Sequence, residues 1–458
     1  MEENNASRPT PSSVSLDGEF EYLDQRLHLS PLIESAARES GFDLGRKLTC
    51  FASVFRLLMT YCLSTWSSRQ TTAWACALGI VPTISHVTML ALLSRSGPFF
   101  HALATSLIRR QKDANHITYP AEFKRLLAID GTCVTSAHHD VDDYERLHLV
   151  FEVCQGSLLD FHMPLGPNVA ESVCHFRWPR DALVLGDRAY CYPSQFRHVR
   201  HAGSRLLTRW PRNKSLYLRG DDGKLEKWDW REALGQLEVG ERRAYRLLLT
   251  ASDPIEVTVY VEHVGTEFAK SELAKNKRNK MKSSAASRQI APFMVLVSNA
   301  TLEEVSLEEA LEGYRMRWQG AEINIREAKS HQGFSRQVLK SVASRQAWLL
   351  AHLCGQLVCQ LWQRRDLDKH NPSDCKTRGF RPTKSMSAVL KASILEALIK
   401  ALCPLSLRSL AENFDTFCAH YLRLQGCSRR QALSHEVYLS KVAPDIDLRA
   451  WKYTCNTT

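Results

Sequence analysis

The spacing of apolar residues predicts helices over roughly the first quarter of the chain. From about Phe20 to Arg110, apolar residues recur every three or four positions, which is the period of an amphipathic helix. Within this region, AWACALGIVPTISHVTMLALLSR (73–95) predicts two short helices, with Gly79 in the turn and the second helix starting near Ser85. This outline fits a DNA-binding helix-turn-helix and an ordinary helical hairpin equally well.

The pattern changes after Tyr119 to short apolar runs bounded by turn residues, which predict strands. A crossover helix is expected over NVAESVCHF (168–176) and another helix over PSQFRHVRHAG (193–203). Strands and helices that alternate in this way indicate an α/β layer with a mixed sheet. The predicted strands are RLLAID (125–130), LHLVFEV (147–153), LLDFHMPL (158–165), ALVLGD (182–187) and SRLLTRW (204–210).

Residues 211–290 have a different pattern, with strands that read as antiparallel and are joined by polar turns. This segment ends in the basic run KNKRNKMKSSAASR (275–288). A buried strand is predicted again over 291–300, and a helix follows, with Ser306 as its N-cap and acidic residues in its first turn. A long apolar helix comes next, over 345–365, before a charged loop and a helical C-terminal segment.

The charge of the chain is unevenly distributed. The formal net charge is +11, but residues 121–192 carry −5 and residues 331–458 carry +10. An acidic region within a basic protein is typical of a nucleic-acid enzyme with a carboxylate metal site, although chance clustering would give the same numbers.

Two features bear on the cellular environment. Residues 70–94 contain no charged side chain, but Gly79, Pro82 and several hydroxyl residues favour two short helices over a membrane span. The fourteen cysteines include no Cys-x-x-Cys pair, and no secretory signal opens the chain, so reduced thiols in a cytoplasmic protein are expected.

Two aspartates follow predicted strands and are the leading candidates for chemistry. Asp130 is followed by Gly-Thr and Asp187 by Arg-Ala-Tyr. An Asp-Gly pair alone is more often a turn than a site. If the two strands are neighbours, however, both carboxylates meet at one edge of the sheet. Glu322, on the helix that contains YRMRWQGAEINIREAK (314–329), is the third carboxylate that would complete a cage for a hard divalent cation such as Mg²⁺.

Taken together, AIDGT (128–132), VLGDRAY (184–190) and the 314–329 helix resemble a DDE transposase of the insertion-sequence family whose signature is Tyr-(2)-Arg-(3)-Glu-(6)-Lys. The similarity extends over roughly residues 45–365 and is weakest in the middle. Each motif alone is a weak signal, but three in order within suitable strand and helix contexts are specific.

The resemblance implies a fold, an activity and a set of partners. The fold would be α/β, with a ribonuclease-H-like mixed-sheet core interrupted by a β-rich insertion and flanked by helical N- and C-terminal regions. The activity would be Mg²⁺-dependent cutting and joining of double-stranded DNA, with Mn²⁺ as a substitute, by a homodimer bound to the terminal inverted repeats of its element and to target DNA. The protein would be cytoplasmic and would associate with the nucleoid when acting on DNA.

The corresponding domain organisation has five parts. These are a disordered tail (1–17), a helical DNA-binding region (18–118), a catalytic core (119–210 and 291–365), the β-rich insertion (211–290) and a helical C-terminal region (366–458).

By position in the motifs, the resemblance makes Asp130, Asp187 and Glu322 the metal ligands and catalytic residues. Tyr314, Arg317 and Lys329 match the residues of the signature that contact DNA. Further DNA contacts are expected from Trp318, Arg188 and the basic run, that is from Lys275, Lys277, Arg278 and Lys280. Each has a plainer interpretation: Trp318 as a packed helix residue, Arg188 as a support for its neighbouring carboxylate, and the basic run as a solvated segment.

The chain departs from the family signature at one point. Four residues, rather than three, separate Arg317 from Glu322. On a regular helix each residue turns the direction of the side chain by about 100°, so Tyr314 would lie about 80° away from Glu322. A π-bulge near Gly320 would restore the shared face. The alternatives are a decayed, non-catalytic DNA-binding protein, or a nuclease of the same fold without a joining step.

Overall fold

The computed structural model describes residues 18–113, 125–135, 144–153, 157–164, 171–211, 214–278, 288–317, 339–370 and 394–402. These residues form two compact units. The first contains residues 18–107, 339–370 and 394–402, and the second contains the described residues between 108 and 317.

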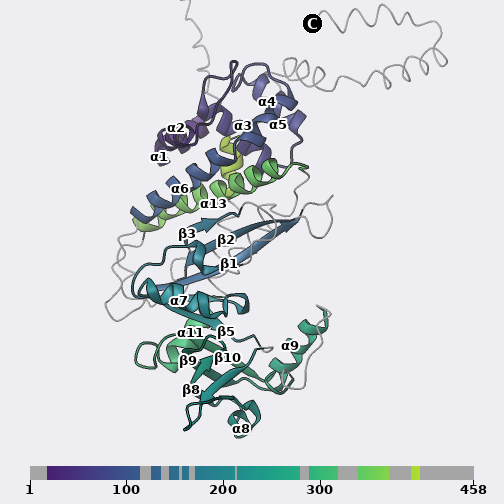
Figure 1. Cartoon of the computed structure of the whole chain (residues 1–458). Helices are drawn as coiled ribbons and strands as arrows, with labels where there is room; N and C mark the ends of the chain where they lie inside the picture. The colour runs from purple at the N-terminus through teal and green to yellow at the C-terminus, as the bar shows by residue number, and fades with distance from the viewer. Residues whose placement is uncertain are drawn as a thin grey trace, which may run out of the picture. The chain divides into compact units, whose positions relative to one another are not determined.

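The first unit is helical, as the 3.6-residue period of the N-terminal region predicts (Figure 1). Its helices are α1 (Gly18–Leu27), α2 (Leu29–Ser40), α3 (Phe51–Leu63), α4 (Ser68–Ala77), α5 (His86–Arg95), α6 (Gly97–Asp113), which continues past the boundary of the unit, and α13 (Val342–His370). A further helical stretch covers 394–402.

Helices α4 and α5 form the predicted pair around Gly79. The Ser67 side chain accepts a hydrogen bond from the Gln70 N–H, and the Gln70 side chain accepts one from the Ser67 N–H, so a capping box fixes the start of α4. Ser85 caps α5 by accepting from the Thr88 N–H at 3.1 Å. Gly79 lies between them with φ of +67°, a conformation that glycine adopts without a steric penalty. The structure confirms the two helices and the turn.

Helix α13 packs against α3 and α5, so the long apolar segment predicted over 345–365 is the central helix of this unit. Gly355 allows α13 to lie close to α3, because a Cβ there would be only 3.1 Å from the nearest methyl carbon of Leu63. Leu57 of α3 and Leu350 and Leu353 of α13 are buried in this unit.

Two further observations concern membrane-spanning helices and cysteines. No helix in the described part of the chain is both long and apolar enough to cross a lipid bilayer. The cysteines in the same part, among them Cys62, Cys191 and Cys354, are free thiols.

The second unit is built on one ten-stranded mixed sheet (Figure 1). Its strands follow the spatial order β3-β2-β1-β4-β5-β10-β9-β8-β6-β7. Their bounds are β1 (Arg125–Thr135), β2 (Tyr144–Glu152), β3 (Ser157–His162), β4 (Ala182–Gly186), β5 (Arg205–Arg209), β6 (Leu216–Arg219), β7 (Leu225–Lys227), β8 (Arg242–Leu249), β9 (Ile255–His263) and β10 (Phe293–Ser298).

The first five strands form a ribonuclease-H-like core, as expected. Strands β1, β2 and β3 are antiparallel neighbours, while β4 and β5 run parallel to β1. One boundary in this core was predicted wrongly. Asp130 does not end β1, because the pairing with β2 continues from Asp130↔Leu149 to Thr135↔Tyr144. The polar residues after Asp130 conceal this extension, since cross-strand hydrogen bonds rather than apolar side chains sustain it.

The insertion extends the core sheet. Strand β10 pairs antiparallel with β5 on one side and with β9 on the other, and β8, β6 and β7 follow outward. Two helices belong to this segment, α8 (Trp230–Leu234) and α9 (Thr266–Arg278). The start of the basic run therefore lies on a helix, and residues 279–287 lie outside the described part of the chain.

The crossover helix predicted over 168–176 was wrong for the residues that the structure describes. Only one 3₁₀ turn, η1 (Val173–His175), is found there. In place of helical hydrogen bonds, the backbone of Val173 forms hydrogen bonds with two side chains. The Gln195 amide oxygen accepts from the Val173 N–H at 2.6 Å, and the Trp178 indole N–H donates to the Val173 carbonyl at 3.0 Å. The helix predicted from 193 is confirmed as α7 (Pro193–His201).

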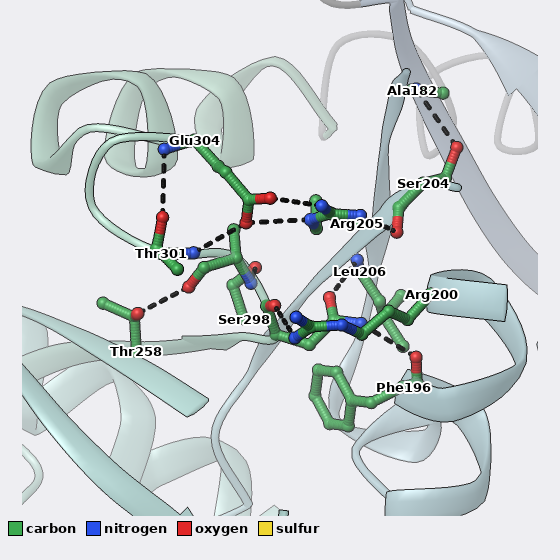
Figure 2. A network of polar contacts seen from close by, with 12 residues as sticks. Ala182, Phe196, Arg200, Ser204, Arg205, Leu206, Thr258, Ser298, Thr301 and Glu304 are labelled. Carbon is green, nitrogen blue, oxygen red and sulfur yellow. Dashed lines mark hydrogen bonds and ion pairs between the residues drawn. The ribbon is translucent and has the colours of Figure 1, made fainter. Parts of the chain in front are cut away.

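A polar network fixes the connection between β10 and the next helix, α11 (Leu307–Arg317), as Figure 2 shows. The Asn299 side chain accepts from the Leu206 N–H and donates to the Phe196 carbonyl, both at 2.8 Å. The Arg205 guanidinium pairs with the Glu304 carboxylate, its Nε lying 2.9 Å from Oε2. Ser306 caps α11 as predicted, accepting from the Glu309 N–H at 3.2 Å. The start of the signature helix is thereby fixed to β5 and α7.

Candidate active site

Asp130 and Asp187 lie side by side on adjacent parallel strands. The register of β1 and β4 pairs Ala128 with Leu185, and two more residues along each strand place Asp130 opposite Asp187. Neighbouring strands are about 4.8 Å apart, and paired residues point to the same face of a sheet. The two carboxylates therefore share one face, and both are partly exposed.

Local hydrogen bonds orient each carboxylate. Asp187 caps the short 3₁₀ helix η2 (Arg188–Tyr190) by accepting from the Ala189 N–H at 2.7 Å. The Asp130 carboxylate accepts from the Gly131 N–H at 3.0 Å.

Helix α11 covers the face that carries the two aspartates. A Cβ on Gly313 would be 3.8 Å from a Leu126 methyl carbon and 3.9 Å from one of Leu183, so the helix rests on β1 and β4. Leu126 lies on the same face of β1 as Asp130, because the two positions are four apart, an even number, along the strand.

Tyr314 and Arg317 lie on this helix, and both are buried, with 5% and 4% of their surface exposed. The Arg317 guanidinium carbon lies 5.5 Å from the centre of the Tyr314 ring. Burial raises the pKa of Tyr314, and the negative charge of Asp187 raises it further, against the opposing effect of Arg317 and other nearby guanidinium groups. The first two signature residues thus reach the carboxylate site from within the protein.

Glu171 is a third carboxylate at this edge, and sequence reasoning missed it. One of its carboxylate oxygens lies 2.8 Å from the position that a Cβ on Gly131 would occupy. Arg146 lies 3.8 Å from the same group. Burial raises the pKa of Glu171, and the charge of Asp187 raises it further. No periodicity or motif in the sequence marks this residue, since it precedes a 3₁₀ turn that reads as part of a helix.

Tyr190 lies close enough to the same carboxylates to feel their charge. Its side chain is fully buried, and its hydroxyl has no hydrogen-bond partner within the described part of the chain. Burial raises the pKa of this phenol well above its ordinary value, and the charges of Glu171, Asp130 and Asp187 add to that effect.

Two arginines flank Asp187. Arg188 follows it in the chain. Arg209 lies beside it across the sheet, since the register of β4 and β5 pairs Gly186 with Thr208 and the next step places Asp187 opposite Arg209. Burial lowers the pKa of Arg209, and the neighbouring charge of Arg188 lowers it further. The only signal for Arg209 in the sequence is its place at the end of a predicted strand.

Both arginines contact Glu272 of the insertion helix α9. The Glu272 carboxylate lies 2.6 Å from Nη2 of Arg188 and 2.9 Å from Nη2 of Arg209. Arg188 was predicted to clamp phosphate or to support Asp187, and the structure shows it paired with Glu272.

Of the other site residues predicted from the sequence, three lie within the described part of the chain and four lie outside it. Lys275, Lys277 and Arg278 lie on the last turns of α9. Lys280, Trp318, Glu322 and Lys329, together with the expected bulge near Gly320, lie outside the described residues.

The donor set fits a hard divalent cation. Asp130 and Asp187 offer carboxylate oxygens on one face, and oxygen ligands are those that Mg²⁺ prefers. In the described part of the chain, which does not include Glu322, no group of three or more His, Cys, Asp or Glu side chains is arranged to hold a metal ion.

Comparison with known proteins gives three findings. Residues 121–356 match the family described as the transposase DDE domain. The InsL protein of insertion sequence element IS186A from Escherichia coli (strain K12) is 23% identical over 335 residues, covering 70% of this chain and 87% of the relative. The transposase of insertion sequence element IS421 from Escherichia coli is 24% identical over 336 residues, again covering 70% of this chain and 87% of the relative.

Among solved structures, a piggyBac transposase synaptic complex with hairpin DNA matches with a TM-score of 0.42 and 10% identity. The match covers 87% of this chain and 84% of that one.

Proposed function

Because the chain belongs to the transposase DDE domain family, we propose that it is a DNA transposase that cuts and joins DNA at the ends of an insertion sequence. One observation of the structure carries this proposal. Asp130 and Asp187 stand opposite each other on the face of the sheet that α11 covers, and Glu322 follows five residues after the last described residue of that helix.

The proposed reaction has two steps. Hydrolysis of a phosphodiester at each end of the element frees a 3′-hydroxyl. Its oxygen then attacks a phosphodiester of the target DNA, forms a new P–O bond there, and displaces the 3′-oxygen of the target strand, which leaves as a free 3′-hydroxyl. Asp130, Asp187 and Glu322 would hold Mg²⁺, with Mn²⁺ as a substitute. When bound, the metal supplies charge stabilisation for the attacking and leaving oxygens and lowers the pKa of water.

The cationic residues around this site would position the DNA. Arg188 and Arg209 flank Asp187, and guanidinium groups bind phosphate through paired hydrogen bonds. Arg317, held against Tyr314 beneath the site, adds positive charge where the phosphodiester must lie. Lys329 and Trp318 are proposed to extend this contact along the signature helix, and Lys275, Lys277, Arg278 and Lys280 to follow phosphates further away.

The other parts of the chain have separate proposed roles. Helices α4 and α5 are the candidate helix-turn-helix for the terminal inverted repeats. A homodimer is proposed because the two ends of an element must be cut and joined together. The acting protein would be cytoplasmic and bound to the nucleoid.

The test is cleavage of a supercoiled plasmid that carries the gene with its native flanks, in Mg²⁺. Wild-type protein is expected to cut at the ends of the element and to join them to new sites. Asp187→Ala is expected to abolish both activities, while Asp221→Asn, in an exposed turn, is expected to leave both unchanged.

Each other outcome has a distinct meaning. Wild-type protein that binds the ends without cutting them would show a non-catalytic DNA-binding protein. Cutting without joining would show a nuclease, and cutting by Asp187→Ala would remove that residue from the catalytic site.

A further inference from the structure

Glu272 is a buried carboxylate on a helix whose other acid is exposed. It lies on α9, in the insertion, and 2% of its surface is exposed. Glu267, one turn earlier on the same helix, has 83% of its side chain exposed and pairs with Lys270 at the surface. Burying a carboxylate is costly unless charged partners compensate for the lost water. The environment of Glu272 must therefore supply such partners.

Two guanidinium groups supply them. Arg188 Nη2 donates to Glu272 Oε2 at 2.6 Å, and Arg209 Nη2 lies 2.9 Å from the same oxygen. Phe268, also on α9, lies against the Arg209 guanidinium, with 5.5 Å between the guanidinium carbon and the ring centre. Through these contacts α9 is fixed to residues that immediately follow β4 and end β5.

These arginines lie next to the two aspartates that are proposed to bind the metal. Across β1, β4 and β5 the extended register places Asp130, Asp187 and Arg209 side by side, and Arg188 follows Asp187 directly. A carboxylate that bridges two guanidinium groups there occupies a position suited to a phosphate, since both anions accept paired hydrogen bonds from arginine.

The sequence of α9 adds a second property. Beyond Glu272 the helix carries Lys275, Lys277 and Arg278. One helix therefore combines an anion that neutralises the two arginines with cations that suit a DNA backbone.

We infer that Glu272 is an internal stand-in for a DNA phosphate, a latch that keeps α9 on Arg188 and Arg209 until DNA displaces it. The latch rests on the proposed DNA-processing function. Incoming DNA exchanges the Glu272 carboxylate for a phosphate on the same two guanidinium groups. The release of Glu272 frees α9 to move with its cations toward the DNA backbone. The two arginines thus hold either α9, through Glu272, or the DNA backbone, but not both at once.

The first test measures binding of a fluorescent duplex that carries the element end, by anisotropy, in Ca²⁺ or without metal so that no cutting occurs. Glu272→Gln keeps the shape of the side chain and removes the competing charge, so it is expected to bind DNA about five- to tenfold more tightly. Glu267→Gln is the matched control, because it makes the same charge change on the same helix away from the arginines, and its affinity is expected to stay within about twofold of wild type.

The second test uses only the wild-type protein and so does not depend on a variant that folds. Hydrogen exchange of the backbone amides of residues 268–276 is measured with and without the duplex. The latch predicts faster exchange in this segment when DNA binds, because Glu272 and Phe268 then no longer hold α9 on the two arginines.

The outcomes separate the latch from the proposed function. Weaker DNA binding by Glu272→Gln, or slower exchange in 268–276 on DNA binding, would show a brace that supports the arginines and would overturn the latch. Equal affinities of Glu272→Gln and Glu267→Gln would overturn it as well. Failure of the wild type to bind any DNA would instead overturn the proposed function, and the latch with it.

Discussion

At the scale of single residues, Gly131 shows how closely the side chains pack at the edge of the sheet that carries Asp130, Asp187 and Glu171. The Glu171 carboxylate fills the space beside it, so an alanine Cβ would lie 2.8 Å from Oε1. Gly131→Ala is therefore expected to displace the Glu171 carboxylate. Because that group is the far end of a flexible side chain, the free energy of unfolding should fall by less than about 1 kcal/mol. The same variant should lose DNA cleavage, because Asp130 is the preceding residue. Urea denaturation and the plasmid assay measure the two effects.

Gly313 provides the control for that substitution. A Cβ there would make ordinary contacts of 3.8 Å and 3.9 Å with Leu126 and Leu183. Gly313→Ala is expected to be neutral or stabilising by up to about 1 kcal/mol, since alanine is the better helix former. If both variants lose stability equally, the loss reflects general crowding of this region rather than the contact of Gly131 with Glu171.

Some residues of the candidate site could be predicted from the sequence, and others could not. Asp130 and Asp187 could be selected because each follows an apolar run, and the structure places them on adjacent strands. Glu171 and Arg209 carried little or no signal, because their importance comes from the register of β4 and β5 and from a side chain that folds over a glycine. Those relations depend on tertiary pairing, which the local pattern does not encode.

At the scale of elements, the connection before α11 decides where the signature helix begins. The Arg205 guanidinium holds the pKa of the Glu304 carboxyl at about 2, against an ordinary value of 4.5, with help from the Thr301 N–H. Because the folded-state pKa is depressed, the stabilisation is complete above pH 4.5 and is lost as the pH falls toward about 2.

Glu304→Gln should therefore reduce the free energy of unfolding at neutral pH, and the difference from wild type should shrink below pH 4.5. The expected loss is only about 1 kcal/mol, because the pair is partly exposed to solvent. Denaturant titrations across pH 3–7 would measure it. Glu256→Gln breaks a more exposed pair with Arg246 and should have a smaller effect, and a loss at Glu304 that does not change with pH would contradict the assignment.

Elements were predicted well where apolar side chains set the period. The strands of the core, the helices around Gly79, and the N-cap of α11 follow from the sequence. The crossover helix over 168–176 failed because Gln195, distant in sequence, takes the Val173 N–H. The position of the insertion in the sheet could not be predicted from the sequence either, since β10 pairs with both β5 and β9, and β5 lies more than eighty residues before it in the chain.

At the scale of the whole molecule, the charge distribution predicts how the protein meets DNA. The chain carries +11 overall, yet residues 121–192 carry −5. The site of Asp130 and Asp187 would repel DNA phosphates, so cationic side chains elsewhere in the chain must attract them. Such contacts release counterions, so DNA affinity should fall steeply as salt rises.

The basic run makes this prediction quantitative. Replacing Lys275, Lys277, Arg278 and Lys280 together by Gln should lower the slope of log affinity against log salt by about 0.9 for each phosphate that the variant no longer neutralises. Sequence preference for the element end should remain, because phosphate contacts carry no base information. Replacing the exposed Arg219, Lys224, Lys227 and Arg231 by Gln makes the same change in net charge elsewhere in the insertion. If both quadruple variants lower the slope equally, only overall charge matters, and the run from 275 to 280 does not track phosphates. A lower slope for the first variant alone would place the DNA backbone along the end of α9.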